Sequence, residues 1–164
     1  MQNPAILVLT TGGTIDKNYF DALSEYQIVD SGIPALLKEA RVKLAFRIEE
    51  VCRKDSLELS DADRSEIARR VAEAPETQVV ITHGTDTMTE TAKVLAGIAG
   101  KTIVLTGALS PARFAETDAP FNLGMAFAAV QIAPPGVYIA MSGQVFDGLQ
   151  VRKDRAAGKF VAIG

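Results

Sequence analysis

The sequence is poor in the residues on which disulfides and metal clusters depend. Its 164 residues include one cysteine, Cys52, and one histidine, His83. A single cysteine excludes an internal disulfide, and the two residues leave too few ligands in a recognisable spacing for a metal site. Basic residues are not in excess either, because 17 Lys and Arg face 20 Asp and Glu, for a net charge of -3. This balance argues against nucleic acid as a partner, since phosphates need a basic surface.

Long apolar segments are also lacking. Gly, Pro or charged residues interrupt every apolar run well before the roughly 20 residues that a membrane-spanning helix requires. Residues 1–6 do not show the basic segment, apolar block and small-residue cleavage site of an export signal. We therefore expect a cytoplasmic protein that does not enter a membrane. With 48% apolar residues the chain can bury one core, and we expect one domain over residues 1–164.

Short β-rich runs alternate with helical patterns. Such near-continuous apolar runs are typical of parallel strands that are covered on both faces, and they occur at residues 5–10, 41–52, 79–82, 102–106 and 137–141. Helices are expected between Ser60 and Pro75, between Met88 and Gly97, and between Asp118 and Pro134, with a shorter one over residues 34–40. The alternation predicts a single-domain α/β fold with a doubly wound, mainly parallel sheet between helix layers.

Small hydroxyl residues and glycines follow the predicted strands. They occur at residues 10–14 (TTGGT), 82–87 (THGTDT), 106–108 (TGA) and 142–143 (SG). Ligands of open parallel sheets bind beyond the carboxyl ends of the strands. Hydroxyls and carboxylates at that edge predict a site for a small ligand, and they leave the reaction open.

The single histidine and the single cysteine are interpreted as structural residues. The sequence has no G-x-S-x-G nucleophile elbow. We expect His83 to order the turn before Thr85, with a catalytic base as the alternative. Cys52 is expected to be a buried small hydrophobic residue rather than a nucleophile.

Two of the glycine-rich segments carry a family resemblance. Residues 10–15 (TTGGTI) resemble the T-G-G-T-I signature of bacterial-type L-asparaginases, and residues 82–88 (THGTDTM) resemble their H-G-T-D-T-M signature. The resemblance continues through residues 105–108, 121–122 and 152–153. Usual members have a second, C-terminal domain, so the chain resembles a short-chain form with the N-terminal, catalytic domain alone.

The resemblance implies a catalytic group. Thr14 matches the nucleophile that attacks a side-chain amide, releases ammonia and forms an acyl-enzyme ester, which water hydrolyses without a cofactor. Thr85 and Lys153 match a second threonine and a lysine that accepts or relays a proton. Asp86 matches the carboxylate that binds the substrate α-amino group and supports the lysine.

The resemblance also implies substrate contacts. Ser56 matches a serine that binds the α-carboxylate, and Asp55 and Gly84 are expected to line the same pocket. Ala108 matches a residue whose backbone carbonyl receives the scissile amide nitrogen. Backbone N–H groups near Thr14 and Thr85 would hold the oxyanion.

Two features of the implied site stay open. Tyr19 and Tyr26 compete for the role of the tyrosine that assists the nucleophile; Tyr19 is favoured because it lies nearer in sequence, while Tyr26 fits the spacing of two-domain enzymes. Relatives complete the α-amino site with a glutamate from a neighbouring C-terminal domain. The candidates to replace it are Asp16, Glu25 and Glu58, and we expect a higher Michaelis constant than in two-domain enzymes.

The predicted function is therefore hydrolysis of L-asparagine to L-aspartate and ammonia, with weak activity on glutamine. The alternatives are a related amidase that supplies ammonia within a larger assembly and a non-catalytic amino-acid-binding subunit. Because the family forms close homo-oligomers, we expect a dimer or tetramer.

Overall fold

A six-stranded sheet forms the centre of the computed structural model, which describes residues 5–164 apart from the side chain of Asp21. The strand order is β4-β1-β5-β6-β7-β8, and β8 alone runs antiparallel to its neighbour. The strands are β1 (Ile6–Gly12), β4 (Phe46–Lys54), β5 (Gln78–Thr82), β6 (Thr102–Thr106), β7 (Gly136–Met141) and β8 (Gln144–Asp147). The predicted α/β class with a mainly parallel sheet is confirmed.

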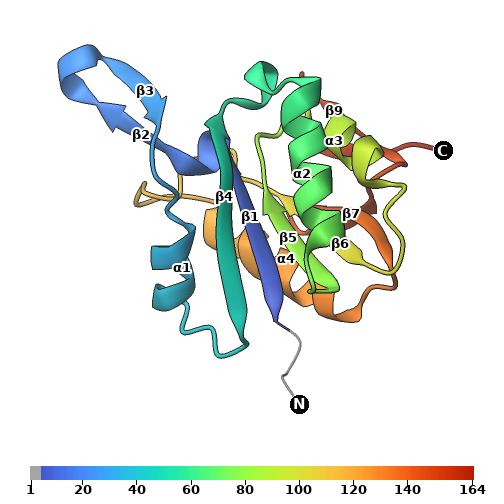
Figure 1. Ribbon diagram of the computed structural model, residues 1–164. Helices are drawn as coiled ribbons and strands as arrows, with labels where there is room; N and C mark the ends of the chain where they lie inside the picture. Colours follow the sequence, from blue (N-terminus) through green and yellow to red (C-terminus); the bar gives the residue numbers. More distant parts are fainter. Residues whose placement is uncertain (1–4) are drawn as a thin grey trace.

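Helices cover both faces of this sheet (Figure 1). They are α1 (Ile33–Glu39), α2 (Asp61–Glu73), α3 (Met88–Leu95) and α4 (Ala119–Ile132). Successive side chains of a strand point to opposite faces. Accordingly, Leu7 and Leu9 of β1 pack in a core with α2 and α3, whereas Ile6 and Val8 pack in a second core with α1 and α4.

The start of α2 shows why a predicted helix boundary is correct. The Ser60 hydroxyl accepts a hydrogen bond from the Asp63 N–H at 3.1 Å, and the Asp63 carboxylate accepts one from the Ser60 N–H at 2.9 Å. This reciprocal capping box satisfies N–H groups that have no partner within the helix. The helix ends before Pro75, as predicted.

The predicted strand at residues 41–52 is wrong in its first part. Strand β4 begins at Phe46, because α1 ends in a turn in which Arg41 has a left-handed φ of 56°.

Cys52 also differs from the expectation of a buried hydrophobic residue. It is half-buried within β4, and its thiol donates to the Thr11 carbonyl at 3.4 Å. Burial raises the pKa of Cys52 to about 11, so the thiol is a poor nucleophile.

Two small antiparallel pairs lie outside the main sheet and were not predicted. One joins β2 (Lys17–Phe20) to β3 (Glu25–Ile28), and the other joins β9 (Val151–Asp154) to β10 (Lys159–Ala162). The β2–β3 hairpin projects away from the body of the molecule beyond the tip of β4 (Figure 1). Three short 3-10 helices complete the described chain: η1 (Thr14–Asp16), η2 (Asp21–Leu23) and η3 (Ser56–Glu58).

Candidate functional site

Three backbone segments touch at the carboxyl edge of the sheet. They follow β1, β4 and β5, and they contain Gly13, Ser56 and Gly84. A Cβ atom at Gly13 would lie 2.5 Å from the nitrogen of Gly84, and a Cβ atom at Gly84 would lie 2.6 Å from the Cβ atom of Ser56. No side chain fits between these segments. The glycines therefore bring the turn that carries Thr14 against the turn that carries Thr85.

A lysine joins two of the predicted catalytic residues. The Lys153 ammonium, on β9, donates to the Thr85 hydroxyl and to the Asp86 carboxylate, each at 2.7 Å. The same carboxylate oxygen lies 3.8 Å from Nε of Arg155. The Lys153 side chain is 15% exposed, so the pair is shielded better than an ordinary surface salt bridge. The structure thus brings Lys153 to the adjacent residues Thr85 and Asp86, which lie 68 and 67 positions away in the sequence.

Thr14 is the first residue of η1 and is half-buried. The preceding Gly13 has a φ of 83°, a left-handed conformation that favours glycine. Within the described residues, 5–164, the Thr14 hydroxyl has no hydrogen-bond partner, so the structure does not join it to Thr85 or Lys153. Its link to that group is the backbone contact between Gly13 and Gly84.

The predicted substrate contacts Asp55 and Ser56 lie at the start of η3. Ser56 is 2% exposed and faces Gly84. Asp55 accepts a hydrogen bond from the Leu57 N–H at 3.2 Å and forms an ion pair with Lys17 at 3.1 Å. Partial burial acts to raise the pKa of Asp55, but the hydrogen bonds from Lys17 and Leu57 outweigh it and hold that pKa below its usual value. Asp55 is thus an ionised group that orients the Ser56 turn.

Ala108 is buried after β6, at the end of a polar network. The Asn122 side-chain amide donates to the Gly107 carbonyl at 2.9 Å, and its oxygen accepts from the Ser142 N–H at 3.1 Å. Asp118 accepts from the same Asn122 amide at 3.0 Å. This network fixes the loop on which Ala108 lies. The prediction placed Asn122 in a family pattern without a role. The sequence signal that could have identified it is an asparagine among the apolar residues of an expected helix, and the structure shows that it is completely buried.

The two candidate tyrosines are cross-strand neighbours. Tyr19 of β2 pairs with Tyr26 of β3, their ring centroids are 5.0 Å apart, and Tyr26 also contacts Phe114 at 5.9 Å. Both rings are largely exposed, at 41% and 53%. Because the two tyrosines occupy one face of the same hairpin, any movement of the hairpin carries both, and their position alone does not separate the two alternatives.

Of the three residues considered for the role of the relatives' α-amino-binding glutamate, Asp16 points away from the predicted site. It is 2% exposed and accepts hydrogen bonds from the Ser31 hydroxyl at 2.9 Å and the Gly32 N–H at 3.2 Å, at the start of α1. Burial raises the pKa of this carboxyl above its ordinary value. Asp16 is therefore a structural residue that ties η1 to α1.

The other two candidates are exposed. Glu25 accepts from the Gln27 side chain at 2.8 Å within the hairpin. Glu58 shares a pocket of about 290 Å³ with Lys17, Tyr26 and Asp55. Glu58 is thus the candidate that lies beside a predicted substrate contact.

His83 is fully buried behind the Gly84–Thr85 turn. Its two ring nitrogens lie 2.6 Å from the Gly84 carbonyl oxygen and 2.7 Å from the Thr91 hydroxyl. Burial lowers the pKa of His83 to about 4, and the Arg64 charge acts in the same direction. The contacts agree with the expectation that His83 orders this turn.

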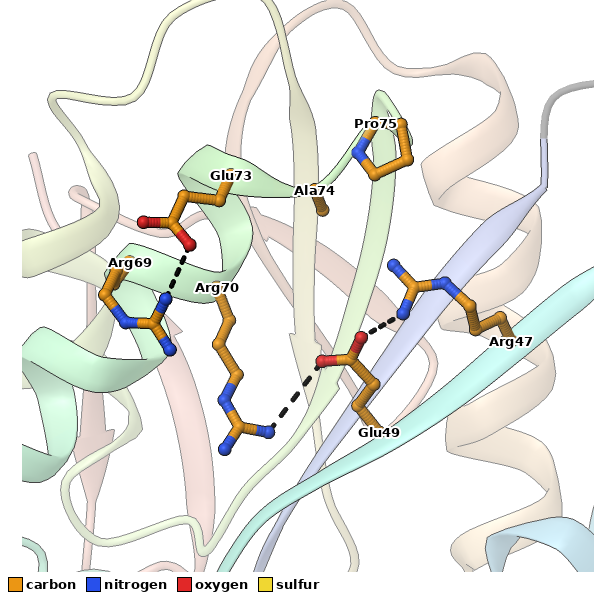
Figure 2. A pocket seen from close by; sticks show the side chains of 7 residues that line it. All are labelled: Arg47, Glu49, Arg69, Arg70, Glu73, Ala74 and Pro75. Carbon is orange, nitrogen blue, oxygen red and sulfur yellow. Dashed lines mark hydrogen bonds and ion pairs between the residues drawn. The ribbon is translucent and has the colours of Figure 1, made fainter.

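A charged pocket of about 360 Å³ lies elsewhere, between α2 and β4 (Figure 2). It is lined by Arg47, Glu49, Arg69, Arg70, Glu73, Ala74 and Pro75. Its charges pair with one another: Arg47 and Arg70 both face Glu49, and Arg69 binds Glu73 at 2.5 Å. No predicted site residue lines this pocket, so we interpret it as an ion-pair network between the helix and the strand.

Among residues 5–164, no group of three or more His, Cys, Asp or Glu side chains could hold a metal ion. None of the helices in this part of the chain is long and apolar enough to cross a membrane.

Comparison with known proteins decides the family. Residues 5–160 match the family model of the asparaginase N-terminal region. The chain belongs to the asparaginase family. An L-asparaginase from Thermococcus kodakarensis is 32% identical over 163 residues, which cover 93% of this chain and 48% of the relative.

Two further similar proteins are informative. A solved structure titled a probable cytoplasmic L-asparaginase, from Campylobacter jejuni, superposes with a TM-score of 0.85 at 30% identity, over 98% of this chain and 54% of that one. A glutamyl-tRNA(Gln) amidotransferase subunit from Pyrobaculum aerophilum is 35% identical over 147 residues, 82% of this chain and 34% of the relative. The chain spans about half the length, or less, of these relatives.

Proposed function

We propose that this asparaginase-family chain hydrolyses the side-chain amide of L-asparagine to give L-aspartate and ammonia, with weaker action on L-glutamine. The observation that carries the proposal is the contact of one lysine, Lys153, with both Thr85 and Asp86 at 2.7 Å. Thr85 and Asp86 follow Gly84 on a turn whose backbone touches the turn of Thr14. A hydroxyl nucleophile needs a proton path, which Thr85 and Lys153 would supply once the Thr14 hydroxyl, unpaired among residues 5–164, moves to Thr85.

In the proposed reaction, the Thr14 oxygen attacks the amide carbon and gives its proton to the Thr85 hydroxyl, which passes its own proton to Lys153 acting as the neutral amine. Backbone N–H groups near Thr14 and Thr85 stabilise the negative charge on the former carbonyl oxygen. The C–N bond then breaks, and the nitrogen takes up a proton to leave as ammonia. Water attacks the resulting ester, which releases aspartate and restores the Thr14 hydroxyl.

The substrate's own charged groups would be held by the residues around this centre. Asp86 carries the negative charge that suits the α-amino group, and Ser56 lies on the adjoining turn for the α-carboxylate. The backbone carbonyl of Ala108 receives the amide nitrogen. Asparagine and glutamine differ by one methylene, which is worth only about 1–3 kcal/mol of discrimination; weaker glutamine turnover is therefore expected.

A second candidate function is that of an amidase subunit in a larger assembly. Its support is the 35% identity to an amidotransferase subunit. The two functions differ in partner dependence. A chain that releases ammonia from free asparagine by itself favours the first, and a chain that is silent alone and active with an added partner favours the second. The third alternative, a non-catalytic binding subunit, is less well supported, because binding alone does not require the Thr85–Lys153 contact.

The test is ammonia release from L-asparagine and L-glutamine by the purified chain. We expect Thr14→Ala to lose at least about 10³-fold in kcat, as removal of a catalytic nucleophile does. Thr14→Ser, which keeps a hydroxyl, is the matched control and should retain measurable turnover. Full activity of Thr14→Ala would exclude Thr14 as the nucleophile.

A further inference from the structure

A line of buried hydrogen bonds runs from two helices to the backbone of the proposed site. Arg64 of α2, which is 6% exposed, donates from Nε to the Thr91 hydroxyl of α3 at 3.2 Å. That hydroxyl contacts Nε2 of His83 at 2.7 Å, and Nδ1 of His83 contacts the Gly84 carbonyl oxygen at 2.6 Å. The line therefore connects helices on one face of the sheet to the turn that contains Thr85.

The partners fix where each hydrogen lies. A carbonyl oxygen only accepts, so Nδ1 of His83 carries the hydrogen and donates to Gly84. Nε2 of a neutral ring then accepts, and the Thr91 hydroxyl donates to it while its oxygen accepts from Arg64. The Arg64 guanidinium is held in turn by the Leu59 carbonyl at 3.1 Å and by Glu90 at 3.4 Å. In each hydrogen bond of this line, the partners therefore determine which atom donates and which accepts.

The last bond of this line sets the orientation of a peptide plane. The Gly84 carbonyl and the Thr85 N–H belong to the same peptide unit, which is planar and trans because the described chain contains no cis peptide bond. In such a unit the C=O and N–H point in opposite directions. The hydrogen bond that draws the Gly84 oxygen toward the buried His83 ring therefore turns the Thr85 N–H away from it.

The Thr85 N–H is also available to a ligand. Within residues 5–164, it has no acceptor on the protein. A Cβ atom at Gly13, the residue before Thr14, would lie 2.7 Å from Cα of Gly84, the atom at which this peptide unit begins, so the unit starts beside the turn of the proposed nucleophile. A rotation of the plane would replace a hydrogen-bond donor by a carbonyl oxygen on the side that faces away from the ring.

We propose that Arg64, Thr91 and His83 are positioning residues that lock the Gly84–Thr85 peptide in the orientation in which the Thr85 N–H stabilises the oxyanion. The inference rests on the proposed function, in which that N–H is one of the oxyanion donors. None of the three side chains touches the substrate. The Thr91 hydroxyl and the Gly84 carbonyl together favour the His83 tautomer with the hydrogen on Nδ1, and that tautomer holds the peptide in its direction.

The first test reads the tautomer directly and needs no activity. His83 is the only histidine in the chain, so protein grown with ¹⁵N-labelled histidine gives the NMR signals of a single imidazole ring. At pH 7 we expect a neutral ring with the hydrogen on Nδ1. In Thr91→Val, which keeps the shape and loses the hydroxyl, this tautomer should no longer be the sole form, and Thr91→Ser should retain it. A ring protonated on Nε2 alone, or on both nitrogens, in the unmodified protein would overturn the proposal.

The second test is kinetic. Thr91→Val should lower kcat for L-asparagine by at least about tenfold, short of the ~10²–10³ that loss of an oxyanion donor costs. The KM should change by less than about twofold, because the oxyanion forms only in the transition state. Thr91→Ser should recover most of kcat. A Thr91→Val protein that folds and has an unchanged kcat contradicts the proposal, as does a change confined to KM.

The two proposals fail in different ways. An inactive unmodified chain, or an active Thr14→Ala variant, would reject the proposed function, whereas the NMR result would still test the tautomer. If Thr91→Val does not fold, the NMR spectrum of the unmodified protein and the kinetics of Thr91→Ser against Thr91→Ala carry the test. In that comparison, equal kcat values for the serine and alanine variants would count against the positioning role.

Discussion

Thr11 and Thr82 are buried side by side at the adjoining ends of β1 and β5, yet their hydroxyls are in different situations. The Thr11 hydroxyl donates to the Thr82 carbonyl at 2.8 Å. The Thr82 hydroxyl has no hydrogen-bond partner among the described residues. A buried polar group without a partner costs desolvation free energy that a methyl group of the same shape does not.

We therefore expect the two residues to respond oppositely to the same substitution. Thr82→Val should leave the free energy of unfolding unchanged or raise it by up to about 1 kcal/mol, whereas Thr11→Val should lower it by about 1 kcal/mol. Urea unfolding of both variants beside the unmodified chain measures the difference. A clear loss of stability in Thr82→Val would show that its hydroxyl is satisfied in solution.

His83 links the stability of the protein to pH. Its pKa is about 4 in the folded chain, compared with 6.5 for an ordinary histidine, because burial and the Arg64 charge oppose protonation. Between these two values the unfolded chain binds the proton and the folded chain does not. The free energy of unfolding should therefore fall as the pH is lowered from 6.5 to 4, by roughly 3 kcal/mol in all.

The variant His83→Gln isolates this contribution. It cannot titrate, so its stability deficit relative to the unmodified protein should shrink as the pH falls through the same window. Urea unfolding at several pH values between 7 and 4 gives both curves. The comparison also removes the contribution of Asp16, whose raised pKa acts in the opposite direction and is common to both proteins. Parallel curves would exclude His83 as the linked group.

At the scale of elements, strands with continuous apolar runs could be predicted from the sequence. Strands β1, β5, β6 and β7 are such runs, and each ends at or just before small hydroxyl residues and glycines. Helix α2 was predictable from its capping box and from Pro75. The beginning of β4 was not, because residues 41–45 continue the alternation of apolar and polar residues although Arg41 turns the chain.

The hairpin strands and β8 to β10 escaped prediction for a different reason. Each has four residues and mixes charged or amide side chains with aromatic or aliphatic ones, as in KNYF and VRKD. A period of two cannot be recognised over so short and polar a segment. Their pairing depends on the partner strand and on the turn between them, which the local pattern does not contain.

The candidate site was predictable only in part from local pattern. The edge of hydroxyls and glycines followed from the order of strands and turns. Lys153 lies 68 residues from Thr85 along the chain, and their contact followed only from the family resemblance. Arg64 and Thr91 were not predicted, because a buried arginine on an amphipathic helix has the same local pattern as an exposed one.

The β2–β3 hairpin carries Tyr19 and Tyr26, the two candidates for the tyrosine that assists the nucleophile. Because they are cross-strand neighbours, kinetics must distinguish them. We expect Tyr19→Phe to lower kcat for L-asparagine by at least about tenfold, as loss of a general acid–base group does, and Tyr26→Phe to act mainly on KM. Both substitutions keep the aromatic ring, so the 5.0 Å ring contact is retained. The opposite order, with the larger fall in kcat for Tyr26→Phe, would assign the assisting role to Tyr26.

For the whole molecule, we expect association into at least a dimer. The chain has a mass of 17.5 kDa, so light scattering should give at least twice that value, 35 kDa. Several large apolar side chains are exposed on the single chain, including Phe121 and Ile132 on α4, at 64% and 84%. Exposed apolar surface of this kind is commonly covered by a second molecule. A scattering mass of 17.5 kDa at the concentrations used for kinetics would contradict the expectation.

The place of β1 in the sheet has a consequence for biosynthesis. This strand is completely buried and pairs with β4 on one side and β5 on the other, both of which follow it in the chain. The helices α3 and α4, which complete its cover on the two faces, follow later still. A ribosome adds about 5–20 residues per second. For several seconds the nascent chain must therefore carry an apolar, strand-forming segment with both edges open, so chaperones that bind nascent chains and the speed of translation should govern how much of this protein reaches its native state.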